Sequence, residues 1–207
     1  MGLSFHYNGR IADTKLLPKL IEDLEDIAEL HKWKYNVFAR NFPVVEAQSD
    51  AQRHNVYGMC FTPPGCETVF VSFLNNGRMS SPILLDFWGE AKKEPEKDYL
   101  YMLSVKTQYA GAEIHKLLIG IFHFLDKKYL TDFELYDEGD YWETGDDKLL
   151  LKNFNQNAFL INSFKSALQS LPIQEDEKPE DYIFRIIKEM KDKQFPDKLD
   201  DDKPSDE

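Results

Sequence analysis

The residues best suited to chemistry lie in one short stretch, from Phe133 to Asp147. Seven of its fifteen side chains are carboxylates, and Tyr136, Tyr141 and Trp142 stand among them. Crowded carboxylates raise one another's pKa values and bind hard cations, while aromatic rings beside them can hold a cation over their faces. The candidate binding residues are Tyr136, Asp137, Glu138, Asp140, Tyr141, Trp142 and Glu143. The same composition is also typical of a solvated loop.

A calcium loop of the EF-hand type does not fit this stretch. A loop beginning at Asp140 would place Gly145 at the required sixth position, but Trp142 would be third and Leu151 twelfth, where oxygen ligands are needed. We expect the carboxylates to fan outward rather than converge on one ion. A looser divalent-metal site remains as an alternative, with ligands drawn from Glu134, Asp137, Glu138 and Asp140.

Other metal-ligating and nucleophilic side chains are scattered along the chain. His115 and His123 share one predicted helix but are eight residues apart, too far for the i, i+4 pair that grips one metal. Cys60 and Cys66 flank a predicted turn, and we interpret both as small core residues. We interpret the five histidines as residues at the boundary of the core: His6, His31, His54, His115 and His123. No catalytic residue, metal ligand or cofactor is assigned.

The charge of the chain is concentrated in its second part. Of the net charge of −12 over 207 residues, residues 131–207 supply −11, from 10 Lys and Arg against 21 Asp and Glu. An electric field of that sign repels phosphates and anionic lipid, which argues against nucleic acid and membranes as partners. It attracts basic proteins, metal cations or amines. The longest apolar run, Leu117–Leu125, is far shorter than a transmembrane helix.

No secretory signal is visible at the N-terminus, so we expect a cytoplasmic location. The two cysteines are too few for a disulfide scaffold and are consistent with a reducing compartment.

The pattern of apolar residues predicts the elements that must position the acidic stretch. Two segments have apolar residues at helical spacing over 17–31 and 111–129. Pro64-Gly65 predicts a type II turn, and Asn76-Gly77 predicts a tight hairpin turn with two positive φ angles. Thr144 and Asp147 fit a capping box that starts a long helix, and Pro179 starts the last one. The predicted strands are 3–8, 34–39, 55–62, 68–74, 81–87, 99–108 and 133–136.

This order of elements predicts an α+β fold. A run of consecutive strands implies antiparallel pairing, so we expect a mostly antiparallel sheet of about five to seven strands with helices packed on one face. A C-terminal helical pair should follow over about 146–190. We expect residues 1–190 to form a single domain and residues 191–207 to form an acidic, disordered tail.

The function that these features favour is a non-enzymatic, soluble intracellular protein that binds a partner through the acidic aromatic segment. The partner would be a basic protein, whose activity this chain could neutralise. Two alternatives remain, which are a divalent-metal-assisted hydrolase using the 134–147 carboxylates and a small-molecule sensor with an aromatic-lined pocket. The sequence does not indicate an oligomeric state.

Overall fold

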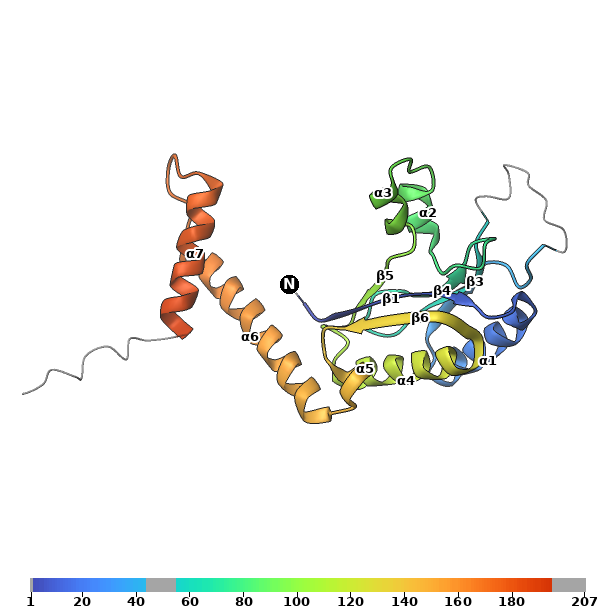
Figure 1. The fold of residues 1–207 in the computed structure, drawn as a ribbon. Helices are drawn as coiled ribbons and strands as arrows, with labels where there is room; N and C mark the ends of the chain where they lie inside the picture. The colour runs from blue at the N-terminus through green and yellow to red at the C-terminus, as the bar shows by residue number, and fades with distance from the viewer. Residues whose placement is uncertain (1, 44–54, 195–207) are drawn as a thin grey trace, which may run out of the picture. The chain divides into compact units, whose positions relative to one another are not determined.

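The computed structural model describes residues 2–43 and 55–194 (Figure 1). Contacts between residues divide the chain into two compact units, one over residues 2–154 and one from residue 155 onward. Two compact units can still belong to one folding domain, so the single domain expected over 1–190 stays a prediction.

Two antiparallel sheets of three strands each form the framework of the first unit. In one sheet the strand order is β5-β1-β6, and in the other it is β2-β3-β4. The α+β class is confirmed. The strands are β1 (Ser4–Ile11), β2 (Lys34–Val37), β3 (Tyr57–Thr62), β4 (Val69–Phe73), β5 (Leu103–Lys106) and β6 (Leu130–Asp137).

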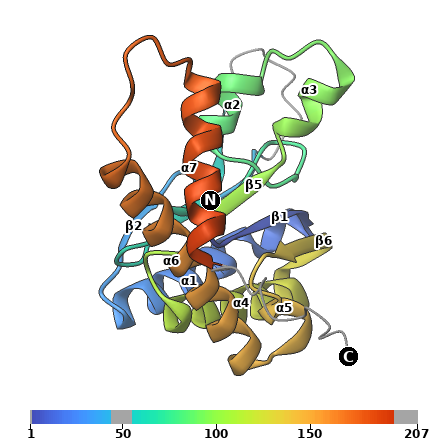
Figure 2. The ribbon, with the colours of Figure 1, turned by 90° about the vertical axis from the view of Figure 1, so that its left-hand side faces the viewer.

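Helices connect and cover these strands. The two helices expected from their apolar spacing are present as α1 and α4, and they lie on the same side of the β5-β1-β6 sheet (Figures 1 and 2). The helices are η1 (Thr14–Leu16), α1 (Leu17–Leu30), α2 (Pro82–Trp88), α3 (Glu94–Tyr99), α4 (Ala112–Tyr129), α5 (Tyr141–Thr144), α6 (Asp147–Ser170) and α7 (Pro179–Gln194).

The prediction of one sheet of five to seven strands is wrong, because the strands divide into two sheets of three and one predicted strand is helical. Residues 81–87 form most of α2, where the Ser81 hydroxyl accepts a hydrogen bond from Leu84 N at 3.1 Å and Pro82 takes the first helical position. A hydroxyl cap followed by proline favours a helix start over a strand. The long strand predicted over 99–108 is shortened to β5, because α3 extends to Tyr99.

The two turns that end β3 and β4 differ in how well the sequence predicted them. The turn at Pro64-Gly65 is confirmed, with Cys66 N bonded to Pro63 O at 3.1 Å and Gly65 at φ 71°. At the second turn Gly77 has φ 76°, but Asn76 is not left-handed. Bonds from Gly77 N and Leu74 N close a three-residue turn instead of the two-residue turn expected.

The core of the first unit lies between the inner face of β1 and helices α1 and α4. Phe122 of α4 packs against Phe5 and Tyr7 of β1, with ring centroids 5.5 and 4.5 Å apart. The Tyr7 hydroxyl donates to Phe70 O at 2.8 Å and accepts from Phe70 N at 3.2 Å. This hydroxyl therefore joins the central strand of one sheet to an outer strand of the other.

The second unit is the predicted C-terminal helical pair, formed by α6 from residue 155 and by α7. Ala167 and Ile186 are buried. Tyr182 donates to Leu171 O at 2.9 Å, and Arg185 bonds Glu177 and Pro172 O. Because α7 continues to Gln194, the first four residues of the predicted tail are helical, and residues 195–207 lie outside the described residues.

Within residues 2–43 and 55–194, no helix combines the length and the apolar character needed to cross a membrane.

Candidate functional site

The acidic aromatic segment begins at the end of β6, where consecutive side chains alternate between the two faces of the sheet. Tyr136 is 65 % exposed, Asp137 is 1 % exposed, and Glu138 is exposed. Strand geometry places residues 136 and 138 on the outer face and residue 137 on the inner face. The prediction that the carboxylates all fan outward is therefore wrong for Asp137.

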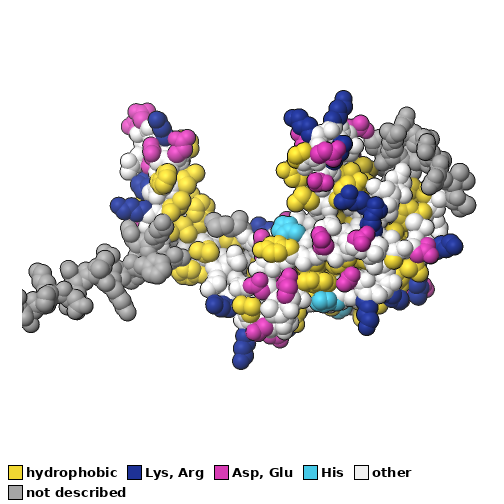
Figure 3. Space-filling view, in the orientation of Figure 1, with side chains coloured by type: hydrophobic (Ala, Val, Ile, Leu, Met, Phe, Trp, Pro, Cys, Tyr) yellow, Lys and Arg dark blue, Asp and Glu magenta, His cyan; other side chains and the backbone are white. Residues whose placement is uncertain are grey.

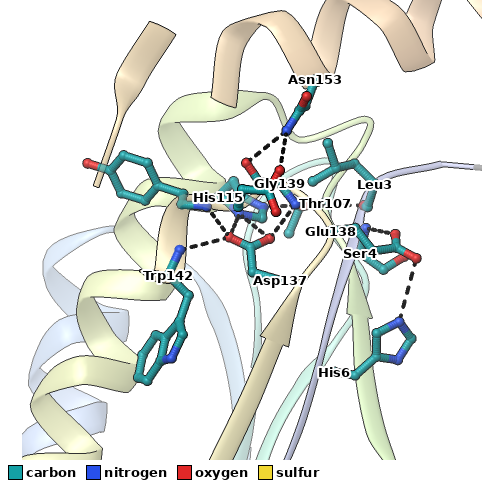
Figure 4. Close-up of polar contacts among 12 residues, drawn as sticks. Leu3, Ser4, His6, Thr107, His115, Asp137, Glu138, Gly139, Trp142 and Asn153 are labelled. Atoms are coloured by element: carbon teal, nitrogen blue, oxygen red, sulfur yellow. Dashed lines mark hydrogen bonds and ion pairs between the residues drawn. The ribbon is translucent and has the colours of Figure 1, made fainter. Parts of the chain in front are cut away.

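Asp137 binds the backbone of the turn that follows it (Figure 4). Its Oδ1 accepts a hydrogen bond from Gly139 N at 2.7 Å, and its Oδ2 accepts from Tyr141 N at 2.8 Å and Trp142 N at 3.1 Å. These donors include the first N–H groups of α5, which have no partner within the helix. The carboxylate thus shapes the loop between β6 and α5 from inside.

A buried histidine completes the coordination of this carboxylate. His115 of α4 is 0 % exposed, and its Nε2 lies 3.1 Å from each Asp137 oxygen. Its Nδ1 lies 2.7 Å from the hydroxyl of Thr107, which in turn lies 3.3 Å from Leu3 O. The prediction of His115 as a boundary residue is wrong, because the whole Thr107–His115–Asp137 network is buried.

Hydroxyl, imidazole and carboxylate in this order form the arrangement that activates a nucleophile in many hydrolases. Here the hydroxyl has no access to a substrate, because the Thr107 and His115 side chains are fully buried. A neutral His115 accepts from Thr107 and donates to Asp137, whereas a charged His115 donates at both nitrogens and leaves the hydroxyl to donate to Leu3 O. In either state each polar hydrogen of the network has an acceptor, so the buried network can stabilise the fold.

Burial on its own would raise the pKa of the Asp137 carboxyl, because it disfavours the charged form. The hydrogen bond and charge interaction with His115, together with the N–H groups of Gly139 and Trp142, more than offset burial and hold that pKa below its ordinary value. The folded chain therefore keeps Asp137 as a carboxylate.

The exposed members of the segment contact the backbone and side chains of β1. Glu138 Oε2 accepts from Ser4 N at 2.7 Å, and its Oε1 lies 3.7 Å from His6 Nε2. The His6 ring is stacked with Tyr136 at 6.2 Å between centroids. These residues form part of the outer face of the β5-β1-β6 sheet.

The side chains of α5 and of Asp140, which precedes it, have different surroundings from one another. Asp140 is exposed in a left-handed conformation and accepts from the Asn153 side chain at 3.2 Å. Trp142 is half-buried and stacked on His123, with ring centroids 3.8 Å apart. Tyr141 is half-buried, and burial together with the Asp147 carboxylate raises the pKa of its hydroxyl. Glu143 is exposed.

The capping box predicted at the start of α6 is wrong, because another side chain accepts the hydrogen bonds of the first helical N–H groups. Asp146, rather than Thr144, accepts from Lys148 N and Leu149 N at 2.8 and 3.2 Å, and the Thr144 hydroxyl accepts from Asp146 N. Asp146 therefore caps the helix, while Asp147 bonds Lys116 at 3.3 Å.

The carboxylates proposed as metal ligands are held by different partners. Glu134 accepts from Asn8 at 3.3 Å, while Glu138, Asp137 and Asp140 have the contacts given above. Among the residues that the structure describes, no three His, Cys, Asp or Glu side chains are grouped so that they could hold a metal ion. The metal-hydrolase alternative therefore has no ligand set within those ranges.

The sensor alternative requires a pocket lined by aromatic side chains. A groove of about 470 Å³ runs beside β4, β5 and α2, and its walls include Cys66, Ile83, Leu84 and Met102. Phe70 is its one aromatic side chain. Both cysteines predicted as small core residues are half-buried, and Cys66, in this wall, packs against the hydrophobic core.

Comparison with known proteins gives no relative: no family model, no curated protein and no solved structure matches this chain.

Proposed function

We propose that this chain is a non-enzymatic binding protein that contacts a basic protein partner through the outer face of the β5-β1-β6 sheet. The observation that supports the proposal most directly is the exposure of Tyr136 between two carboxylates of the same face. Glu134, Tyr136 and Glu138 follow one another at every second residue, so their side chains project from the sheet together. Asp140 and Glu143, which follow β6 in the chain, are exposed too.

The chemistry of this face suits a lysine-rich or arginine-rich partner. An exposed tyrosine offers a large contact area and a ring face for a cation, and two flanking carboxylates supply complementary charge. In Figure 3, acidic side chains recur over the visible face of residues 2–154, and basic side chains lie among them. Attraction of a basic partner therefore depends on the local group at the sheet, because acidic and basic side chains are mixed elsewhere on that face.

The test is a titration of isotope-labelled protein with an oligolysine peptide, followed by NMR. We expect amide shifts concentrated at Ser4, His6 and residues 134–138, and weaker binding as salt is added. The double variant Glu134→Gln, Glu138→Gln should weaken binding roughly twofold to thirtyfold, as the loss of two exposed ion pairs worth about 0.2–1 kcal/mol each. Tyr136→Ala should weaken it without changing the net charge.

A matched control separates local recognition from attraction to the total charge. Asp26 and Glu29 are exposed carboxylates on α1, which lies on the opposite side of this sheet (Figure 1). The variant Asp26→Asn, Glu29→Gln removes the same charge and should bind as wild type does. Equal losses in both double variants, or shifts spread over the whole chain, would contradict the proposed surface.

A further inference from the structure

The tripeptide Asn-Gly-Arg occurs twice in this chain, at residues 8–10 and 76–78. The structure pairs the two copies with each other as short antiparallel segments. Arg10 lies opposite Arg78, Ile11 N donates to Gly77 O at 3.0 Å, and Met79 N donates to Gly9 O at 2.9 Å. The second copy follows the three-residue turn after β4, and the first copy lies in β1.

These two hydrogen bonds flank the arginine pair, so Arg10 and Arg78 form the non-hydrogen-bonded type of antiparallel pair. In that type the Cα atoms are about 4.5 Å apart and the side chains are closest. Like charges directly opposite each other across a sheet destabilise it. The two arginine side chains therefore leave the backbone from adjacent positions, and an anion bound between them would relieve their mutual repulsion.

Uncharged groups hold the two guanidinium groups in place. Arg10 Nη1 donates to Asn76 O at 3.2 Å, and the Arg78 guanidinium lies 3.4 Å from the centre of the Tyr101 ring. Asn76 also accepts from Arg78 N at 3.0 Å and donates to the Tyr101 hydroxyl at 3.1 Å. One asparagine thus links both arginines and the aromatic ring that supports one of them.

The other described arginines have carboxylate partners. Arg40 bonds Glu25 through two nitrogens, and Arg185 bonds Glu177 through two nitrogens. For Arg10 and Arg78, no described carboxylate lies within ion-pair distance. In a chain with 37 acidic and 25 basic residues, two adjacent arginines without such a partner are unexpected.

A cavity of about 240 Å³ opens at this pair, and its walls are Asn8, Gly9, Arg10, Arg78 and Asp132. It lies at the bulge where the pairing of β1 with β6 shifts between Asn8 and Arg10, and Asp132 adopts φ 50° there. One water occupies roughly 30 Å³ in the liquid, so the cavity has room for a small polar group. The Asp132 carboxylate reduces the formal charge of the walls from +2 to +1.

We propose that Arg10 and Arg78 bind the carboxylate or phosphate group of a small molecule in this cavity. The guanidinium fork matches the paired oxygens of both groups, and its N–H donors remain available on the side away from Asn76 and Tyr101. This proposal does not rest on the proposed function. The site shares the outer face of β1 with the acidic group but lies at the opposite end of the strand from Ser4, and its wall residue Asn8 bonds Glu134.

The experiment uses the full chain and two probes, inorganic phosphate and acetate, each compared with chloride at equal ionic strength. We expect phosphate, acetate or both to raise the melting temperature by a few degrees at tens of millimolar. They should also shift the guanidinium NMR resonances of Arg10 and Arg78. The probe with the larger effect identifies the group that the site prefers.

Two substitutions at the site and one elsewhere make the result decisive. Arg10→Gln and Arg78→Gln should each weaken the effect at least tenfold in anion concentration. Arg10→Lys keeps the charge but loses the planar fork, so it should respond less than wild type. Lys127→Gln removes one exposed positive charge at the end of α4 and should respond as wild type does. A wild-type chain that responds no more to either probe than to chloride, or glutamine variants that respond as wild type does, would overturn the proposal.

Discussion

His115 Nε2 lies 3.1 Å from both carboxylate oxygens of Asp137, and both side chains are buried. This contact joins the first turns of α4 to the end of β6. Because the same carboxylate also accepts three N–H groups of the following loop, the buried pair determines how the acidic aromatic segment leaves the sheet. The exposed surface proposed for binding therefore depends on an interaction inside the core.

The first prediction concerns the loss of this carboxylate. Asp137→Ala should lower the free energy of unfolding by about 3–5 kcal/mol, because it leaves His115 and several backbone N–H groups buried without their acceptor. The measurement is urea denaturation at neutral pH. Asp140→Asn is the control, since Asp140 is exposed and surface changes usually stay within about 0.5 kcal/mol. Equal small effects of both substitutions would show that the Asp137 contacts contribute little.

The second prediction is a dependence of stability on acid. The pKa of Asp137 is lower in the folded chain than its ordinary value of about 3.9, so the unfolded chain takes up this proton first as the pH falls. Its contribution is therefore fully present above the unfolded pKa and is lost as the pH falls through the folded pKa. The difference in unfolding free energy between wild type and Asp137→Asn should shrink from pH 5 towards pH 2. A constant difference over that range would contradict the lowered pKa.

The periodicity of the sequence contains a signal for the buried network. Thr107 continues the inward alternation of Leu103 and Val105, and His115 lies three residues before the buried Leu118. Asp137 likewise follows Leu135 at the strand spacing. Polar residues at three core-facing positions predict a buried network, because each must find a partner inside. Which of them would meet could not be read from the sequence, since they belong to three separate elements.

The fold was predictable where many residues shared one pattern and was missed where few did. Helices α1 and α4 have 14 and 18 residues, long enough for their apolar stripes to be unambiguous. Helix α2 has 7 residues, and over so short a length an apolar run fits a strand or a helix equally well. The bulge in β6 and the pairing of the two Asn-Gly-Arg segments are long-range features, so local patterns did not indicate them.

The third prediction compares two glycines. A Cβ atom on Gly139 would lie 2.7 Å from Leu150 Cδ1 and 3.1 and 3.2 Å from the buried Asp137 and His115 side chains. Gly139→Ala should therefore destabilise the chain by about 1–3 kcal/mol. Gly120 lies within α4 with no atom within 4 Å of its Cβ position, so Gly120→Ala should stabilise it by about 0.5–1 kcal/mol. Thermal and urea unfolding of both variants measure these effects, and a neutral Gly139→Ala would contradict the tight packing around the network.

The last prediction decides between the proposed binding surface and the metal-hydrolase alternative. Glu134, Asp137 and Glu138 contact Asn8, His115 and Ser4, and they do not converge on one point. Millimolar Mg²⁺, Mn²⁺ or Ca²⁺ should therefore change the melting temperature only as much as sodium chloride at equal ionic strength. The measurement is a thermal shift series on wild type and on Glu134→Gln, Glu138→Gln. A metal site would instead stabilise the folded state by about 2.7 kcal/mol at a hundredfold excess over its dissociation constant. A rise specific to one metal and absent in the double variant would favour the hydrolase, because it would show that these two carboxylates can rearrange to share an ion.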